Sequence, residues 1–249
     1  MKRIILLLFM LVSLSLSAAP TVATADSAYN ARNYAEAARQ YQVLVDSIPS
    51  ADLYYNLGNA EYRLKHFSQS VLAYQRALRI APDHADAQYN LAVVRSRLAD
   101  HFCKPSEMFF VSWFKQMITS HSVAGWVKFS FCSLLLFFVF IGIYLFTSRL
   151  ALRKVGFFAA IVAMLLFLLS TAFALVQRHH YYHNVDAVIT AEEVELYTSP
   201  TLRSKKVRSI HEGTTVTIVE QMGKSWIQVQ LPDHTSAWME ARDFETVAQ

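Results

Sequence analysis

Two continuous apolar runs, at residues 126–147 and 155–176, occupy the middle of the chain. The short segment between them carries the basic residues Arg149, Arg153 and Lys154 and no acidic residue. A helix needs about 20 apolar residues to cross the hydrocarbon core of a bilayer, and so short a connection joins two antiparallel helices. The runs therefore predict a transmembrane hairpin, with the segments before and after it on the same side of the membrane.

The charges at the hairpin and at the N-terminus predict the orientation. Short loops rich in Lys and Arg stay in the cytoplasm, so both flanking regions are expected outside. Lys2 and Arg3 precede an apolar stretch, and residues 23–25 (Ala-Thr-Ala) then form a cleavage motif, which is the pattern of a secretory signal. Cleavage after Ala19 is less attractive because Pro20 would follow the cut, and an uncleaved anchor is an alternative that leaves the next segment outside. These features fit a multi-pass protein of a bacterial inner membrane with both soluble domains in the periplasm.

The formal net charge of +4 does not indicate nucleic-acid binding. Residues 26–102 hold eight basic and eight acidic side chains, and residues 185–249 hold six basic and ten acidic ones. The positive excess therefore lies in the signal and the membrane flanks, where it sets the topology and contacts anionic membrane lipid. Neither soluble region has the basic surface that phosphate contacts require.

A repeat of 33–34 residues precedes the apolar runs. The segment Tyr55-Asn56-Leu57-Gly58 recurs 34 residues later as Tyr89-Asn90-Leu91-Ala92. At a spacing of 33, Tyr34, Ala37, Tyr41 and Pro49 match Phe67, Ser70, Tyr74 and Pro82. This small, aromatic and proline pattern is the signature of the tetratricopeptide helix–turn–helix repeat, with Gly58 and Ala92 at close helix contacts. Only about two and a half units are present where about three are needed, so another segment must cover the exposed end of the last helix, predicted at 84–102.

The segment 106–120 is an aromatic, amphipathic helix by its pattern. Its apolar members are Phe109, Phe110, Trp113, Phe114, Met117 and Ile118. It can lie in the membrane interface, as helices rich in Trp and Phe do, or it can be the missing partner helix of the third unit. Lys115 and the closely following span favour the interface.

Candidate ligand-binding residues lie on the leading helices of the repeats. They are Asn56, Asn59, Arg63, Asn90 and Arg97. On the concave face of the array these side chains would hold a peptide backbone or an acidic tail, and the paired asparagines resemble the peptide-holding arrangement of tetratricopeptide domains. Alternatively, they are solvated surface residues.

Residues 185–249 change to a period of two. Short alternating runs separated by Gly213, Gly223 and Pro232 predict five or so strands and a small all-β barrel. The order of segments 194–200, 210–216, 226–229 and 237–239 resembles a bacterial SH3-like domain, although Ala237 stands where such domains usually have Gly. Tyr197, Trp226 and Trp238 would form a shelf that binds a peptide or a glycan, or they belong to the core.

No sequence pattern indicates catalysis. The chain has no nucleophile elbow, no zinc-protease motif and no phosphate-binding glycine loop. His179, His180 and His183 have no carboxylate or thiol among them, and Cys103 and Cys132 lie at different depths. We therefore expect no enzyme activity, no metal, no cofactor and no disulfide.

The order of these modules resembles the BatE proteins of the Bacteroides aerotolerance operon. The resemblance implies an inner-membrane protein that acts beside von Willebrand-type Bat proteins and a MoxR-type ATPase. The predicted function is that of a non-enzymatic membrane scaffold that recruits envelope proteins in a stress or aerotolerance complex. The alternative is a cell-wall-binding or sensing protein whose barrel holds peptidoglycan.

The predicted chain is thus a multidomain membrane protein. Its order is signal peptide 1–25, tetratricopeptide repeats 26–102, amphipathic linker 103–125, transmembrane helix 126–147, cytoplasmic loop 148–154, transmembrane helix 155–177, linker 178–184 and SH3-like domain 185–249.

Overall fold

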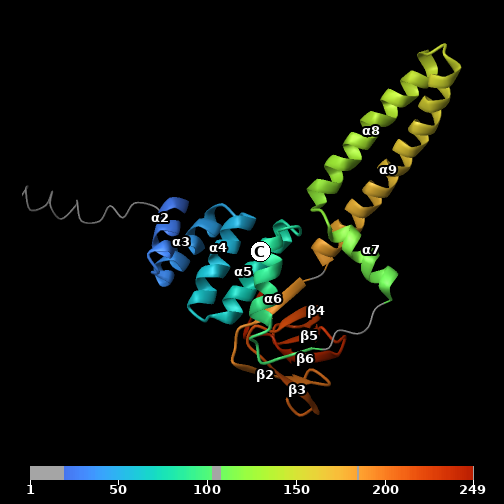
Figure 1. Ribbon diagram of the computed structural model, residues 1–249. Coiled ribbons are helices and arrows are strands. Elements are labelled where there is room, and N and C mark those ends of the chain that lie inside the picture. The colour runs from blue at the N-terminus through green and yellow to red at the C-terminus, as the bar shows by residue number, and fades with distance from the viewer. Residues whose placement is uncertain (1–19, 103–107, 184, 249) are drawn as a thin grey trace, which may run out of the picture.

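The computed structural model describes residues 20–102, 108–183 and 185–248. The predicted signal as far as residue 19, and Cys103, lie outside the described residues. Figure 1 shows a helical array, a long helical hairpin and a β-domain beneath the array. The predicted fold class is confirmed in these three parts.

The helical array consists of α2 (Val22–Asn30), α3 (Tyr34–Ser47), α4 (Ala51–Arg63), α5 (Phe67–Ile80) and α6 (Ala85–Arg95). The first four helices form two antiparallel pairs, and α6 is the leading helix of a third unit without a second helix (Figure 1). Tyr41 and Tyr74, at equivalent positions of the repeat, are almost completely buried between the helices. The aromatic positions of the repeat therefore form the core of the array.

The same turn closes both helix pairs. Arg32 (φ 63°) and Lys65 (φ 67°) adopt the left-handed conformation directly after α2 and α4. The backbone N–H groups of Lys65 and His66 donate to the carbonyl oxygens of Tyr62 and Glu61, which is the Schellman arrangement of a helix C-terminus. The third unit lacks this turn, because the chain leaves the array after α6 ends at Arg95.

Helix α2 spans the predicted cleavage point. Its N-cap, Thr21, forms a reciprocal capping box with Thr24, and Ala25 is completely buried. A chain cut after Ala25 would lack the first turn of this helix and its buried contact. Cleavage of the signal itself stays a prediction.

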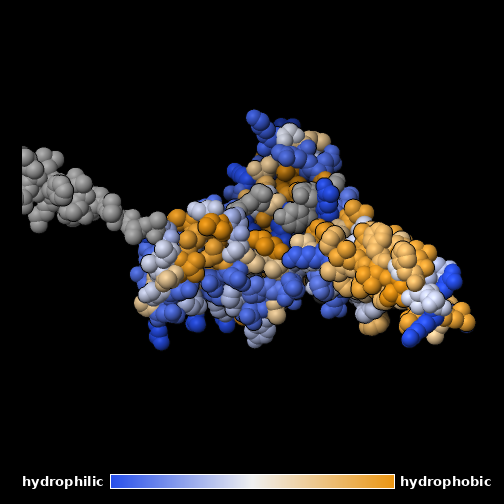
Figure 2. Space-filling model, turned by 90° about the horizontal axis from the view of Figure 1, so that it is seen from above, coloured by the Kyte–Doolittle hydropathy of each residue, from blue (hydrophilic) through white to orange (hydrophobic). Residues whose placement is uncertain are grey.

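The hairpin is formed by α8 (Val123–Phe146) and α9 (Leu150–His183), both long and apolar enough to cross a membrane. Most of the predicted loop 148–154 is helical, so the connection is shorter than expected. The two helices meet through small residues and hydroxyls: Gly156, Ala160, Ala163, Ser170, Ala174, Ser130 and Ser133 are buried. Most of the large apolar side chains point outward and cover the hairpin with hydrophobic surface (Figure 2). Small residues at the contact and large apolar side chains outside it are the arrangement expected of helices that pack in a membrane.

Helix α7 (Phe109–Thr119) lies at the base of the hairpin (Figure 1). Phe114 stacks edge-on against Phe173 of α9, with 5.6 Å between ring centroids. Trp126 of α8 donates from Nε1 to the carbonyl oxygen of Ile118 at 2.8 Å. The segment therefore packs on the hairpin rather than as the second helix of the third repeat.

The β-domain, called the barrel below after its predicted type, is one antiparallel sheet. It contains β1 (Val185–Ile189), β2 (Glu193–Tyr197), β3 (Lys206–His211), β4 (Thr215–Met222), β5 (Trp226–Gln230), β6 (Ser236–Glu240) and β7 (Phe244–Thr246), in the order β3-β2-β6-β5-β4-β1-β7. Leu196, Ile210, Ile227, Val229 and Met239 form its core. Ala237 lies buried in β6 without a positive φ, so its backbone does not need glycine there.

The barrel, and not α7, packs on the last unit of the array. Val188 of β1 and Val247 share one buried apolar cluster with Leu98 and the array core. Residues 98–102 then run along the barrel: Leu98 packs on Gly213, where an added Cβ would lie 2.5 Å from Leu98 Cδ2. Farther along, the guanidinium carbon of Arg208 lies 4.8 Å from the centroid of the Phe102 ring. The end of the array that the sequence leaves without a partner helix is thus covered by the C-terminal domain.

Polar contacts fix this docking. Gln75 Nε2 donates to Thr215 Oγ1 at 2.7 Å, and Arg76 Nη2 donates to the carbonyl oxygen of Thr246 at 3.0 Å. Asp100 accepts three hydrogen bonds from the turn between β3 and β4. The array and the barrel therefore form one structural unit.

Candidate binding site

A groove of about 380 Å³ lies on the concave face of the array. Helices α2, α4, α5 and α6 supply its walls. Its lining residues are Tyr29, Tyr55, Asn59, Tyr62, Arg63, Tyr74, Asn90, Val93 and Val94. The groove therefore combines aromatic rings, amides and a guanidinium on a surface made by regular helix spacing.

A hydrogen-bond network forms the floor of the groove. Asn59 Oδ1 accepts from Tyr74 Oη at 2.7 Å and from Asn90 Nδ2 at 2.8 Å, which links α4 to α5 and α6. Asn90 Nδ2 also lies 3.4 Å from Tyr55 Oη. Burial raises the pKa of Tyr74, so its hydroxyl stays protonated and remains a donor. The floor is polar, uncharged and held in one geometry.

Two arginines lie along the rim. The guanidinium carbon of Arg63 lies 5.8 Å from the centroid of the Tyr34 ring, and that of Arg97 lies 5.6 Å from the Tyr62 ring. Both contacts are within the range of cation–π attraction. These stacked cations can pair with carboxylates of a ligand that lies in the groove.

The structure brings together some of the predicted groove residues. Asn59, Arg63 and Asn90 line the groove, whereas Asn56 and Arg97 do not line it, although Arg97 stacks on the lining residue Tyr62. The tyrosine lining was missed. Tyr55 and Tyr89 occupy equivalent positions of the repeat. Tyr55 of α4 faces the next leading helix, α6, and lines the groove, whereas Tyr89 of α6 has no following unit to face and is 71% exposed.

The three barrel aromatics lie together, beside the main apolar cluster of the barrel and not within it. Tyr197 and Trp226 stack edge-on with 5.8 Å between centroids, and Tyr197 pairs with Trp238 across β2 and β6. Tyr197 and Trp238 are only 6% and 9% exposed, so Trp226 offers the most accessible ring of the three. They come from β2, β5 and β6, whereas the array is contacted from β1, the β3–β4 turn and the β7 end.

Comparison with known families agrees with both soluble parts. Residues 22–85 and 55–97 match the tetratricopeptide repeat, and residues 192–245 match the bacterial SH3 domain. The chain joins a tetratricopeptide array to a bacterial SH3-like domain. No curated protein matches the chain. Both domain types are typically non-catalytic and bind other molecules, and tetratricopeptide arrays bind proteins.

No metal centre is found in the part of the chain that the structure describes. There, no group of three or more His, Cys, Asp or Glu side chains is placed to hold an ion. The side chains of His180 and His183 are not among the described ones.

Proposed function

We propose that the chain is a non-enzymatic, membrane-anchored scaffold whose concave groove binds an extended acidic segment of a partner protein. The observation that carries this proposal is the groove itself, where a fixed amide network lies beneath two stacked guanidinium groups. Grooves of this kind bind extended peptides by backbone hydrogen bonds and select them by charge.

The amides would recognise the ligand backbone. Within the described part of the chain, Asn59 Nδ2 and Asn90 Oδ1 take no part in the floor network, which uses the other atom of each amide. One group donates and the other accepts, so together they match one peptide unit. Arg63 and Arg97 would hold ligand carboxylates, and Asn56 would extend the contacts by one turn of α4.

Membrane anchorage is the second part of the proposal. The outward-facing large apolar side chains, the small-residue contact between α8 and α9, and the aromatic helix α7 at their base all support two crossings with α7 in the interface. The basic turn near Arg149 would face the cytoplasm, which places both domains in the periplasm of a bacterial inner membrane. The docking of the array on the barrel requires both to lie on one side.

The setting of this scaffold is proposed from the order of its modules. That order supports a BatE-type protein in a stress or aerotolerance complex. Its partners would then be envelope or membrane proteins, namely the von Willebrand-type Bat proteins and the MoxR-type ATPase system.

The test is photo-crosslinking in intact membranes, with a photoreactive amino acid in place of Tyr62. We expect a protein partner to be captured, and we expect Arg63→Gln with Arg97→Gln to reduce capture about 30-fold, because each of the two charged hydrogen bonds contributes about 1 kcal/mol or more. Arg39→Gln is the matched control, since Arg39 is exposed on α3 and pairs with Glu36 of the same helix. Equal capture by the groove variant and the control would exclude groove binding.

A second candidate, peptidoglycan binding by the barrel, is favoured by the accessible ring of Trp226 beside Tyr197 and Trp238. Purified cell-wall material would then retain the protein. Trp226→Ala would lose retention, and Leu202→Ala, a matched loss of an exposed apolar side chain, would keep it. Retention that is unchanged in Trp226→Ala would contradict this role.

A further inference from the structure

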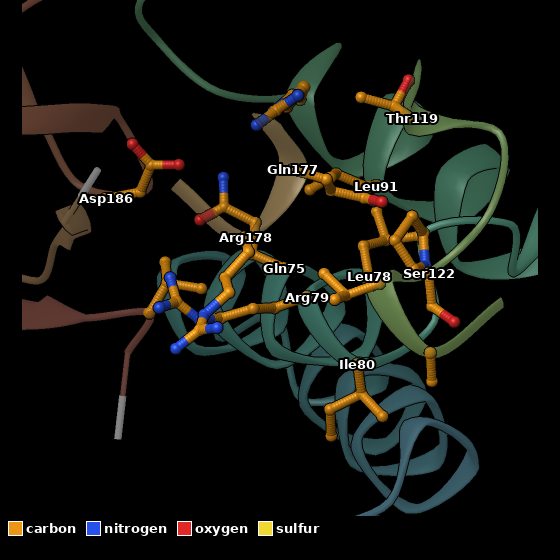
Figure 3. Close-up of a pocket in the computed structure, with 15 residues that line it drawn as sticks. Gln75, Leu78, Arg79, Ile80, Leu91, Thr119, Ser122, Gln177, Arg178 and Asp186 are labelled. Atoms are coloured by element: carbon orange, nitrogen blue, oxygen red, sulfur yellow. The ribbon is translucent and has the colours of Figure 1, made fainter. Parts of the chain in front are cut away.

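A larger cavity, of about 870 Å³, lies where the array, the base of the hairpin and the barrel meet. Figure 3 shows its lining side chains, which come from α5, α6, the corner between α7 and α8, the end of α9 and the start of the barrel. Its volume is within the range of small-molecule sites. The cavity is separate from the concave groove, because the two share no lining residue.

Positive charge predominates in this cavity. Arg79 of α5, Arg95 of α6 and Arg178 of α9 line it, and among the described lining residues Asp186 is the only acidic one. Asp186 already accepts a hydrogen bond from Thr217 at 2.7 Å. Three elements that are far apart in the sequence thus contribute cations to one cavity, with Arg95 beside Asp186 and Thr215, whereas the array as a whole has balanced charge and the barrel is acidic.

Much of the remaining wall is apolar, beside the polar side chains of Gln75, Thr119, Ser122 and Gln177. Leu78 and Leu91 come from the array, Val123 from the first turn of α8, and Val247 from the barrel. A site for a small hydrated anion would not need such walls. Cations beside aliphatic side chains match a ligand that has a charged head and an apolar body.

The cavity lies at the end of the apolar part of the hairpin, and this position indicates which kind of ligand it would bind. Ser122, the N-cap of α8, and Gln177, the residue after the apolar run of α9, both line it. Gln177 Nε2 donates to the carbonyl oxygen of His121 at 2.8 Å, which joins the two helices at this level. In a bilayer the hydrocarbon would therefore end here, and Trp126 and α7 supply the aromatic residues typical of such a boundary.

We propose that this cavity binds the headgroup of an anionic membrane phospholipid, with its phosphate among Arg79, Arg95 and Arg178 and its acyl chains along the hairpin. The site rests on the proposed membrane crossing. A bound lipid would join three parts of the protein at the membrane surface. It would thereby hold the groove at a fixed height above the bilayer.

The test uses the full chain in nanodiscs that contain phosphatidylcholine with a small fraction of phosphatidylglycerol. After transfer to detergent, native mass spectrometry should detect one retained phosphatidylglycerol per chain. Arg79→Gln with Arg178→Gln should weaken retention about 30-fold, since each arginine near a membrane surface contributes about a fivefold preference for anionic lipid. Arg39→Gln is the control for loss of positive charge elsewhere, and the tryptophan fluorescence spectrum of each variant checks folding.

The possible results distinguish a lipid headgroup from free phosphate, and failure of this site from failure of the membrane crossing. Millimolar inorganic phosphate should not displace the lipid, and displacement would mean that the cavity binds free phosphate instead. Equal retention by the double variant and Arg39→Gln, or equal retention of phosphatidylcholine, would overturn the proposal. Release of the chain by alkaline carbonate would refute the membrane crossing itself. An integral chain without bound anionic lipid would refute only this site.

Discussion

Gly58 shows, at the scale of single residues, how the repeat builds the groove. A Cβ atom at this position would lie 2.6 Å from Cε1 of Tyr74, and the carbonyl oxygen of Gly58 accepts from Ser70 Oγ at 2.9 Å. Tyr74 in turn donates to Asn59 on the groove floor. The close approach of α4 and α5 therefore positions the binding network.

We expect Gly58→Ala to destabilise the array by about 1–3 kcal/mol, because Tyr74 would have to leave its packed position. Ala92, the equivalent residue of the third unit, is the control. It is exposed because no second helix packs on it, so Ala92→Val should change stability by less than about 0.5 kcal/mol. Thermal unfolding of the detergent-solubilised chain measures both, and equal stability of the two variants would mean that this contact does not limit the packing.

These two residues also mark how far the repeat pattern could predict contacts. The sequence pattern treats Gly58 and Ala92 alike, and the helix contact exists only for Gly58. A residue at a repeat position forms the expected helix contact only when the second helix of its unit is present. Whether that helix is present depends on where the array ends, which the repeat pattern at one position does not indicate. The same reason explains why Tyr55 lines the groove while Tyr89 is exposed.

At the scale of elements, the hairpin depends on one close backbone contact. A Cβ atom at Gly156 of α9 would lie 3.0 Å from both the carbonyl oxygen of Phe140 and the backbone nitrogen of Tyr144. Farther along, Ser130 Oγ and Thr171 Oγ1 lie 2.8 Å apart across the same interface. Such hydrogen bonds contribute about 0.6 kcal/mol each in membranes, so helix approach rather than hydrogen bonding is expected to dominate.

Gly156→Leu is therefore expected to separate the two helices near their connection and to cost about 1–3 kcal/mol. Gly142→Leu is the matched control, because a Cβ atom at Gly142 meets nothing within 4 Å. Unfolding in mixed micelles with increasing SDS measures the difference. If Gly142→Leu were as destabilising as Gly156→Leu, this packing of the hairpin would be wrong.

Most elements could be predicted because their signals are local. Apolar length indicates α8 and α9, and alternation indicates β2 and β5. The three-residue strand β7 was missed because it is too short to show alternating apolar and polar residues. Its partner, β1, lies at the opposite end of the domain sequence. The side-chain exposure of the barrel aromatics also depends on such pairing, so the sequence favoured the core over the shelf for all three aromatics and could not distinguish Trp226 from Tyr197 and Trp238.

At the scale of the whole molecule, the barrel replaces the helix that the array lacks. The sequence indicates that a cover is needed, but it does not indicate which segment supplies it. The interface residues Gln75, Arg76 and Asp100 are polar and have no periodic pattern, and their partners lie more than 100 residues away. Such contacts depend on the assembled surfaces of both domains, which explains why the sequence offered only the segment 106–120 as an alternative cover and did not indicate the barrel.

The polar centre of this interface predicts a pH dependence of docking. Asp100 accepts from the backbone N–H of His211 at 2.6 Å, from Thr214 Oγ1 at 2.7 Å and from the His211 ring at Nδ1, 2.9 Å away. Burial alone would raise the pKa of Asp100, but these hydrogen bonds outweigh it and lower the pKa below its ordinary value. The bond to Asp100, together with nearby Glu193, raises the pKa of His211.

These opposite shifts define the window in which docking is strongest. The depressed pKa of Asp100 contributes stability above about pH 3.9, which is lost as the pH falls through the folded-state pKa. The raised pKa of His211 contributes stability that is complete below about pH 6.5 and is lost as the pH rises through its folded-state value.

We therefore expect the unfolding temperature of the barrel, measured by tryptophan fluorescence, to fall as the pH rises from 6 to 9. Asp100→Asn should remove most of this slope, because only the weaker effect of Glu193 on the ring is left, and should cost about 1–3 kcal/mol at pH 6. Glu36→Gln, which removes a carboxylate from the exposed face of α3, should keep the slope, and a slope that persists in Asp100→Asn would show that another group controls docking.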